Sequence, residues 1–444
     1  MPHRTSVFSC TILSYISTIL LCISFSHVLA QTFQPVIKTG SLSAFADGKA
    51  MYVLGGDSGS GQSYSTQAFM IDLSVSWNAT SPAYKSLPDG PVGFYQMANA
   101  LSPDGETWFA QNGNTAFFFD VKASKWTSVP DIKTSDKNVN SKFGLGAATD
   151  PETGIIYIPN GLVNNNGQYM LKLHPDRTTD STDMSSQMSN VSGSTVAWSS
   201  ARQSMIYLDE STGNTFSYSP KEGWSQLNVT GAIPIPRSDA CLVAAYEGTK
   251  MILFGGYDTK LQASLNTIHI LDTPTLTWTS GHNFDQTIGR MGSACAASGD
   301  YFIAWGGKSR VTDLDELASN APLVYNIKNN TWTSSYIAPD LSIAAATKSR
   351  TRAIAISGAV LGTVALVGIL GYIYYRHRQS KKSKAVDAGD YLHPPPVSNY
   401  YEKTEPSSIA SITGGIGGYR MSDFNINPTN PPTYSMATTH PAYR

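Results

Sequence analysis

The most regular feature of the chain is a repeat of short apolar strands, tight turns and tryptophans. Five tryptophans, each preceded by an alternating apolar and polar run and a turn, are separated by 49, 98, 54 and 54 residues, and 98 is two periods of 49. They are Trp77, Trp126, Trp224, Trp278 and Trp332. Each run, such as FFFDVKASKW, predicts a strand, a turn and a second strand. The spacing predicts six units, the third of which lacks its tryptophan.

A further apolar strand precedes each of these runs, and in three units it ends in a glycine pair. The strands read MYVLGG, MILFGG and FIAWGG, with the pairs at 55–56, 255–256 and 306–307. Together with PRSDACLVAA at 236–245, this pattern resembles a kelch repeat, in which four strands make one blade of a β-propeller. The resemblance covers residues 31–346. It implies an all-β, kelch-type propeller of six blades, with seven as the alternative.

The resemblance assigns packing roles to the repeated residues. A glycine pair at a strand end allows backbone angles closed to other residues and a close approach of the next strand. The tryptophans fill the space between neighbouring sheets. Residues 33–37 precede the first inner strand, so we expect them to pair with the last blade and close the ring, with Pro35 at an edge.

Two long apolar segments flank the repeats. Residues 1–30 have a weakly basic start, an apolar core and the small residues of a cleavage site, which predicts a signal peptide, although an uncleaved anchor is the alternative. Residues 353–375 carry no charge and are long enough for one transmembrane helix. More basic residues follow this segment than precede it, which predicts a single-pass type I protein of the plasma membrane or endomembranes. Gly358 and Gly362 form a small-residue face that could support weak dimerisation of the helix.

Asn-x-Ser/Thr acceptors for N-glycosylation lie only between the two apolar segments, in keeping with this topology. They are Asn78, Asn190, Asn228 and Asn329. The formal net charge of −1 gives no indication of a nucleic-acid partner. The sequence also contains no zinc-spaced His/Cys cluster, nucleophile elbow or phosphate-binding loop, so we expect neither a metal site nor a cofactor.

The remaining candidates come from the resemblance, in which loops joining second to third strands, and one blade to the next, face the ligand. These loops contain Asp57, Asp258 and Asp313, although such loops can also be merely solvated. Arg237 and Arg290 open adjacent inner strands where kelch relatives often place ligand-contacting arginines, and an ion-pairing role within the scaffold is equally open. Cys241 and Cys295 follow on the same two strands. An oxidising compartment favours a disulfide between them, but the separation of neighbouring strands could prevent it.

The arrangement is also similar to the propeller of galactose-oxidase-like copper enzymes, which gives an alternative function as a membrane-anchored copper radical oxidase. Such a site needs two His and two Tyr around copper, one Tyr being cross-linked to Cys. Residues 31–346 contain only three histidines, His174, His269 and His282. The residues present do not support this chemistry, so we expect no catalytic residues.

Residues 376–444 are rich in Pro, Ser, Thr and Tyr and predict a disordered cytoplasmic tail. Pro431, Pro432 and Tyr434 match the Pro-Pro-x-Tyr ligand of WW domains, which predicts recruitment of a HECT-type ubiquitin ligase. The chain as a whole resembles kelch-repeat membrane proteins of the galactose-oxidase-like or attractin-like, fungal cell-surface type. The function expected from this is binding, adhesion or sensing of an extracellular glycan or protein.

Overall fold

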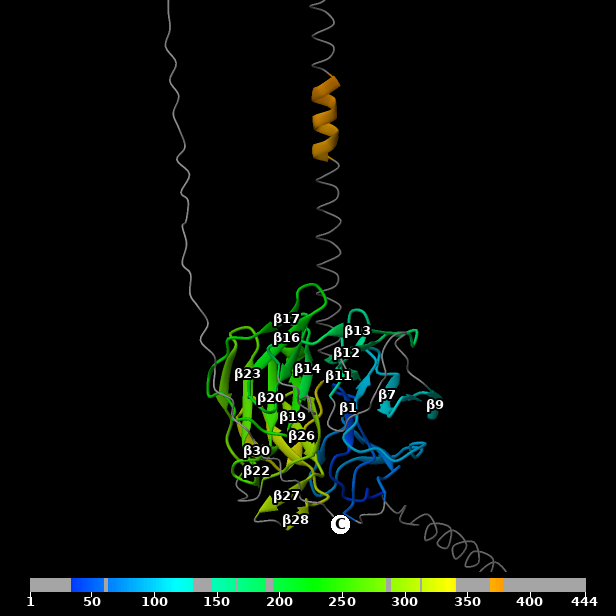
Figure 1. Cartoon of the computed structure of the whole chain (residues 1–444), viewed down its shortest axis with the longest axis vertical. Helices are drawn as coiled ribbons and strands as arrows, with labels where there is room; N and C mark the ends of the chain where they lie inside the picture. Colours follow the sequence, from blue (N-terminus) through cyan, green and yellow to red (C-terminus); the bar gives the residue numbers. More distant parts are fainter. Residues whose placement is uncertain are drawn as a thin grey trace, which may run out of the picture. The chain divides into compact units, whose positions relative to one another are not determined.

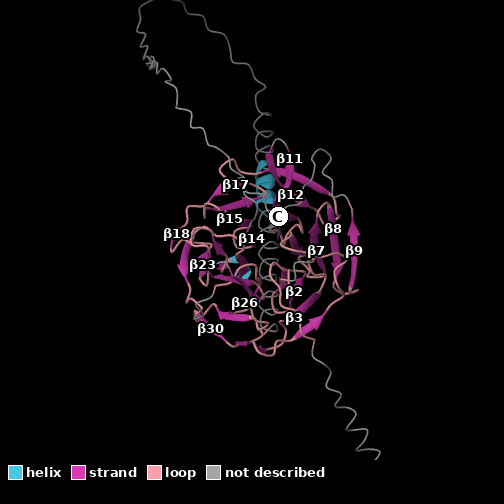
Figure 2. Ribbon diagram, turned by 60° about the horizontal axis from the view of Figure 1, so that its bottom comes forward, coloured by secondary structure: helices cyan, strands magenta, loops and turns pink. Residues whose placement is uncertain are grey.

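Five four-stranded sheets and one five-stranded sheet, arranged around a common axis, form the body of the protein in a computed structural model (Figures 1 and 2). The structure describes residues 33–59, 63–130, 146–164, 167–188, 195–284, 289–311, 314–340 and 368–378. Each sheet is one blade, and its first strand lines the axis. The inner strands contact one another in the order β1, β6, β10, β14, β19, β25 and back to β1. The prediction of a six-bladed all-β propeller is confirmed.

The first three blades follow the repeat order of four strands each. Blade 1 contains β1 (Leu42–Ala46), β2 (Ala50–Leu54), β3 (Ala68–Asp72) and β5 (Tyr84–Ser86). Blade 2 contains β6 (Asn99–Leu101), β7 (Thr107–Asn112), β8 (Thr115–Asp120) and β9 (Lys125–Val129). Blade 3 contains β10 (Ala148–Thr149), β11 (Ile156–Asn164), β12 (Gly167–Leu173) and β13 (Thr179–Asp183).

The last three blades repeat this order. Blade 4 contains β14 (Thr195–Ser199), β15 (Ser204–Leu208), β16 (Thr215–Ser219) and β17 (Gly223–Gln226). Blade 5 contains β19 (Cys241–Ala245), β20 (Lys250–Phe254), β23 (Ile268–Asp272) and β24 (Thr277–Ser280), with β18 (Thr230–Gly231) added in parallel outside β24. A short 3-10 helix, η1 (Tyr246–Gly248), joins β19 to β20. Blade 6 contains β25 (Ala294–Ser298), β26 (Tyr301–Trp305), β29 (Leu323–Asn326) and β30 (Thr331–Thr333).

The core consists of apolar layers between successive blades, because each sheet buries both of its faces only against its neighbours. The repeated tryptophans lie in or against these layers. Three of them also join blades through the indole N–H, which donates to a carbonyl of the preceding blade: Trp126 to Pro88, Trp224 to Asp183 and Trp332 to His282. The predicted packing role of the tryptophans is thus confirmed.

The glycine pairs join each blade to the next one. Gly56, Gly256 and Gly307 donate their N–H groups, each over 2.8 Å, to the carbonyls of Phe94, Arg290 and Lys38, which precede the next inner strands. The first glycine of each pair has φ between 65° and 72°, and an added Cβ would lie 2.3–2.5 Å from the same carbonyl oxygens. Only glycine fits this conformation and this close approach.

The ring closes differently from the sequence expectation. Residues 33–37 form no strand, and Pro35 contacts the last blade only through its carbonyl, which accepts a bond from the Asn320 side chain. Instead β31 (Ser335–Tyr336), which follows the last blade, pairs antiparallel with β4 (Trp77–Asn78) of the first. The expectation was wrong because Tyr336 is fully buried at this junction, where it stacks on Trp77 and donates to the Leu73 carbonyl.

The remaining described element is a helix at residues 368–378, which belongs to a unit separate from the propeller. It contains the end of the predicted membrane segment 353–375, whose earlier residues lie outside the described part of the chain. Among the described residues, no helix combines the length and the apolar composition needed to cross a bilayer. The signal peptide 1–30, Gly358, Gly362, Asn190 and the tail motif at Pro431, Pro432 and Tyr434 also lie outside the described residues.

Candidate functional site: the loop face and the channel mouth

Three long connections between second and third strands gather at one end of the ring. They are residues 55–67 of blade 1, 255–267 of blade 5 and 306–322 of blade 6. Those of blades 5 and 6 fold into the hairpins β21–β22 (Tyr257–Asp258, Ala263–Ser264) and β27–β28 (Lys308–Val311, Leu314–Leu317). The hairpins lie side by side, and the Arg310 N–H donates to the Ser264 hydroxyl over 2.8 Å. We call this end of the propeller the loop face.

The predicted acidic residues of this face mainly shape its loops. Asp57 pairs with Thr39 through the backbone, and its carboxylate accepts the Gly59 N–H over 2.8 Å. The buried Asp258 accepts the N–H groups of Lys260 and Leu261, which forms the turn of β21–β22. Asp313 lies outside the described residues.

The structure places Arg237 and Arg290 inside the scaffold rather than on the loop face. Arg237 is 3 % exposed and Arg290 7 % exposed. Arg237 donates to the Gly255 carbonyl and the Thr267 hydroxyl, and Arg290 lies 3.5 Å from the Gly306 carbonyl. Burial lowers the pKa of each to about 10, which still leaves both charged near neutral pH. Their contacts with the Gly255 and Gly306 carbonyls support the glycine turns.

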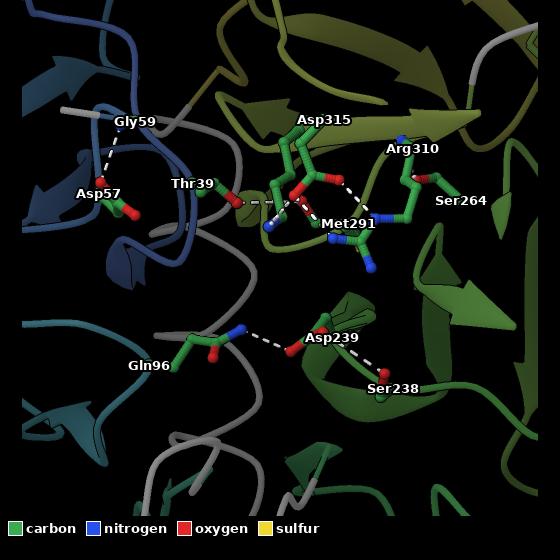
Figure 3. A network of polar contacts seen from close by, with 11 residues as sticks. Thr39, Asp57, Gly59, Gln96, Ser238, Asp239, Ser264, Met291, Arg310 and Asp315 are labelled. Atoms are coloured by element: carbon green, nitrogen blue, oxygen red, sulfur yellow. Dashed lines mark hydrogen bonds and ion pairs between the residues drawn. The ribbon is translucent and has the colours of Figure 1, made fainter. Parts of the chain in front are cut away.

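An ion-pair cluster stands on the loop face in β27–β28. Asp315 accepts bonds from Arg310 at 2.5 and 2.9 Å and from Lys308 at 2.7 Å (Figure 3). The hydrogen bond from Arg310 is the main cause that holds the pKa of Asp315 down, at about 2. The Arg310 guanidinium also lies 5.5 Å from the centre of the Tyr257 ring. The sequence prediction singled out Asp313 in this loop but missed Lys308 and Arg310, the bases that pair with Asp315.

A second feature, absent from the sequence predictions, closes the channel mouth. Just before the inner strands of blades 1, 2, 5 and 6, Gly40, Gln96, Asp239 and Gly292 have left-handed φ between 46° and 65°. Their backbones form a belt: Gly292 donates to the Asp239 carbonyl, Gly40 to Gly292 and Gln96 to Gly40, over 2.8–2.9 Å. Aligning the units on these positions would have revealed that only two of these four carry side chains.

Those two side chains meet across the axis. The Gln96 amide donates to the Asp239 carboxylate over 2.5 Å, and the two residues belong to blades 2 and 5, which are opposite in a ring of six (Figure 3). Burial raises the pKa of Asp239, although the bond from Gln96 opposes this. Beneath the pair is a channel cavity of about 390 Å³ lined by the inner strands. Glu210 lies in its wall, where burial raises the carboxyl pKa to about 8 against a hydrogen bond from Thr195.

Cys241 and Cys295 also line this channel, and the structure joins them in a disulfide between β19 and β25 with a Cα separation of 6.1 Å. The histidines are dispersed. His174 follows β12 and pairs with Asp180, whereas His269 lies in β23 against the Ala232 carbonyl. Within the described part of the chain, no three or more His, Cys, Asp or Glu side chains are grouped to hold a metal ion.

Comparisons with known proteins support the same architecture. A profile of the KLHDC2/KLHL20/DRC7 Kelch-repeats domain matches residues 209–361. The solved structure titled "Structure of YjhT" superposes with a TM-score of 0.51 at 12 % identity, covering 68 % of this chain and 98 % of its own. Residues 33–340 form a six-bladed kelch propeller. Kelch propellers are typically non-enzymatic scaffolds that bind protein partners.

Curated relatives share part of the chain. Acyl-CoA-binding domain-containing protein 6 of Oryza sativa subsp. japonica is 34 % identical over 90 residues, which is 20 % of this chain and 13 % of the relative. Acyl-CoA-binding domain-containing protein 5 of Arabidopsis thaliana is 26 % identical over 276 residues, 56 % of this chain and 40 % of the relative. This chain therefore spans less than half the length of these relatives.

Proposed function

We propose that the protein is a cell-surface binding protein whose propeller uses the loop face to bind an extracellular protein. The observation that carries this proposal is the grouping of exposed apolar side chains around the ion-pair cluster. Leu261 is 66 % exposed, Tyr64 41 % and Leu317 37 %, and each stands on one of the three long connections. Apolar side chains beside charged ones suit a protein interface. A glycan is the alternative ligand, and the experiment below distinguishes the two.

The positions of the glycosylation acceptors fit this use of the loop face. Asn78 in β4 and Asn329 in the β29–β30 turn are exposed and lie in connections between third and fourth strands. In antiparallel blades these connections lie at the opposite end from the loop face. Asn228, between β17 and β18, is exposed as well. Glycans at Asn78 and Asn329 would therefore leave the loop face open.

The membrane topology and the tail complete the proposal. The apolar segment 353–375 would anchor the protein as type I, with residues 376–444 in the cytoplasm. Pro431, Pro432 and Tyr434 would then bind WW domains of a HECT-type ligase. Retention of a purified WW domain by the wild-type chain, with loss in Tyr434→Ala, is the expected result. Equal retention by both chains would contradict the tail assignment.

The ligand function is tested with the full-length chain displayed on cells that lack it. Cells are applied to arrays of extracellular proteins and of glycans, and the variant Leu261→Asp/Leu317→Asp is compared with Ile337→Asp. Ile337 is 59 % exposed and follows β31, so it controls for an added charge away from the loop face. We expect cells with the wild-type chain or with Ile337→Asp to be captured on a protein of the array. Cells with Leu261→Asp/Leu317→Asp should not be captured on that protein. Capture on glycans alone, or equal loss in both variants, would reject the proposal.

A further inference from the structure

A small pocket opens on the loop face directly above the Gln96–Asp239 pair. Its volume is about 130 Å³, and residues of blades 1, 2, 5 and 6 line it, among them Tyr95, Gln96, Asp239, Tyr257 and Lys308. A cavity of about 150 Å³ holds one benzene molecule. The pocket thus has room for the end of one side chain.

The two bases and two carboxylates around the pocket are paired unevenly. Both bases, Lys308 and Arg310, form ion pairs with the one carboxylate of Asp315. The hydrogen-bond donors to Asp239 are neutral, the Gln96 amide and, at 3.4 Å, the Ser238 hydroxyl. Lys308 attracts the carboxylate electrostatically, but none of the ion pairs found among the described residues includes Asp239. A desolvated carboxylate without a directly bonded cation is costly, and an incoming cation would offset that cost.

The lining of the pocket also favours a cation of a particular kind. Aromatic faces attract ammonium and guanidinium groups, and the Tyr257 ring already has the Arg310 guanidinium at 5.5 Å. Tyr95 stacks on Tyr64 with ring centres 4.7 Å apart, which holds it at the pocket edge. A hard metal ion would need six or more oxygen ligands, and no such acidic group occurs among the described residues.

We infer that this pocket is a subsite for one basic side chain, lysine or arginine, of the protein ligand, with the Asp239 carboxylate as its counter-ion. This inference rests on the proposed function, because it names the ligand chemistry recognised at the centre of the loop face. The Gln96 amide is a positioning group that fixes the carboxylate at the base of the pocket. Because Asp315 is bonded to both Lys308 and Arg310, Asp239 is the carboxylate of the pocket that remains to accept a basic group of the ligand.

The experiment uses the purified full-length protein and immobilised peptides that differ only in one central residue, Lys, Arg, Gln or Glu, within a Gly/Ser sequence. We expect retention on the Lys and Arg peptides to exceed that on the Gln peptide about tenfold, since charge-assisted bonds are about twice as strong as neutral ones. Asp239→Asn removes the charge, still accepts the Gln96 bond and tolerates the left-handed conformation. It should lose the preference, whereas Asp300→Asn, in the β25–β26 turn away from the loop face, should keep it.

Equal retention of the Lys and Gln peptides, or an unchanged preference in Asp239→Asn, would overturn the subsite. The two proposals fail in different ways. A protein ligand that binds wild type and Asp239→Asn equally but is lost in Leu261→Asp/Leu317→Asp leaves the loop-face function intact and rejects the subsite. A protein ligand that is insensitive to both variants rejects the loop face itself.

Discussion

Gln96 and Asp239 are 143 positions apart in the sequence, yet their side chains form one hydrogen bond across the axis of the propeller. Each residue occupies a left-handed position that is glycine in the neighbouring blades 1 and 6. Side chains at such positions are energetically unfavourable, so their presence indicates a role that glycine cannot fulfil. That role is to span the channel mouth and to form the base of the pocket above it.

The first prediction concerns the strength of this bond. A double-mutant cycle of Gln96→Ala and Asp239→Ala should give a coupling free energy of about 1.5–3 kcal/mol, as expected for hydrogen bonds to charged groups. Urea unfolding of the four proteins measures it. Ser102→Ala, which removes a bond to Asp104 on the exposed surface, serves as a comparison and should change stability by less than about 1 kcal/mol. A coupling near zero would show that the two side chains act independently.

The glycine turns give a second prediction. Gly306→Ala should destabilise the protein by several kcal/mol, because the added Cβ would lie 2.5 Å from the Lys38 carbonyl oxygen at a positive φ. Gly113→Ala is the matched control, since Gly113 also has a positive φ but no atom lies within 4 Å of the added Cβ. Its cost should be limited to about 1 kcal/mol from the backbone alone. Thermal unfolding of both variants makes the comparison, and equal losses would contradict the close-approach argument.

The disulfide gives a third prediction. Cys241 and Cys295 are 54 residues apart in sequence, so their bond restricts a long loop of the unfolded chain. Reduction should lower the free energy of unfolding by about 4 kcal/mol, on the model in which loop closure dominates. Thermal melting with and without reductant measures this. Cys241→Ser/Cys295→Ser should melt like the reduced wild type and respond no further to reductant, and a reductant-sensitive double variant would disprove the assignment.

Glu210 gives a prediction about pH. Its folded pKa of about 8 is above the ordinary value of 4.5, so the native state binds the proton more tightly than the unfolded state does. Its stabilising contribution is therefore complete below about pH 4.5 and is lost as the pH rises through 8. Glu210→Gln should be more stable than wild type at pH 9, on the order of 2 kcal/mol, because the buried carboxylate is ionised at that pH. The difference should shrink at pH 5. If the stability difference between Glu210→Gln and wild type did not change with pH, the Glu210 carboxyl would be solvated and its pKa would be ordinary.

The fold was readable from the sequence because its determinants are repeated. The tryptophans and glycine pairs recur with the period of the blade, so the repeat can be recognised without a structure. Ring closure was not readable in this way. Trp77 belongs to the repeat series, but its partner Tyr336 follows the last blade and carries no periodic signal. The expectation for residues 33–37 failed for that reason.

The candidate site was less predictable than the fold. Loop positions could be assigned from the repeat, but the partners of each charge depend on how loops from separate blades meet. The positions of Arg237 and Arg290 at the start of adjacent inner strands predicted a ligand site. Their burial and their bonds to backbone carbonyls show instead that they support the scaffold. Lys308, Arg310 and Asp315 are close in sequence, yet their pairing follows from the β27–β28 register, which no local pattern specifies.

The pairing of β31 with β4 has a consequence for biosynthesis. Trp77 leaves the ribosome long before Tyr336, and until then the first blade lacks the strand that covers its outer connection. Until then the early blades are only partly assembled and their apolar surface is uncovered. Roughly 250 further residues must be translated, which at about 5–20 residues per second takes on the order of 10–50 seconds. During this interval the nascent chain exposes apolar surface to which chaperones bind. A variant that weakens the final strand should therefore first lower the yield of folded protein rather than the ligand affinity.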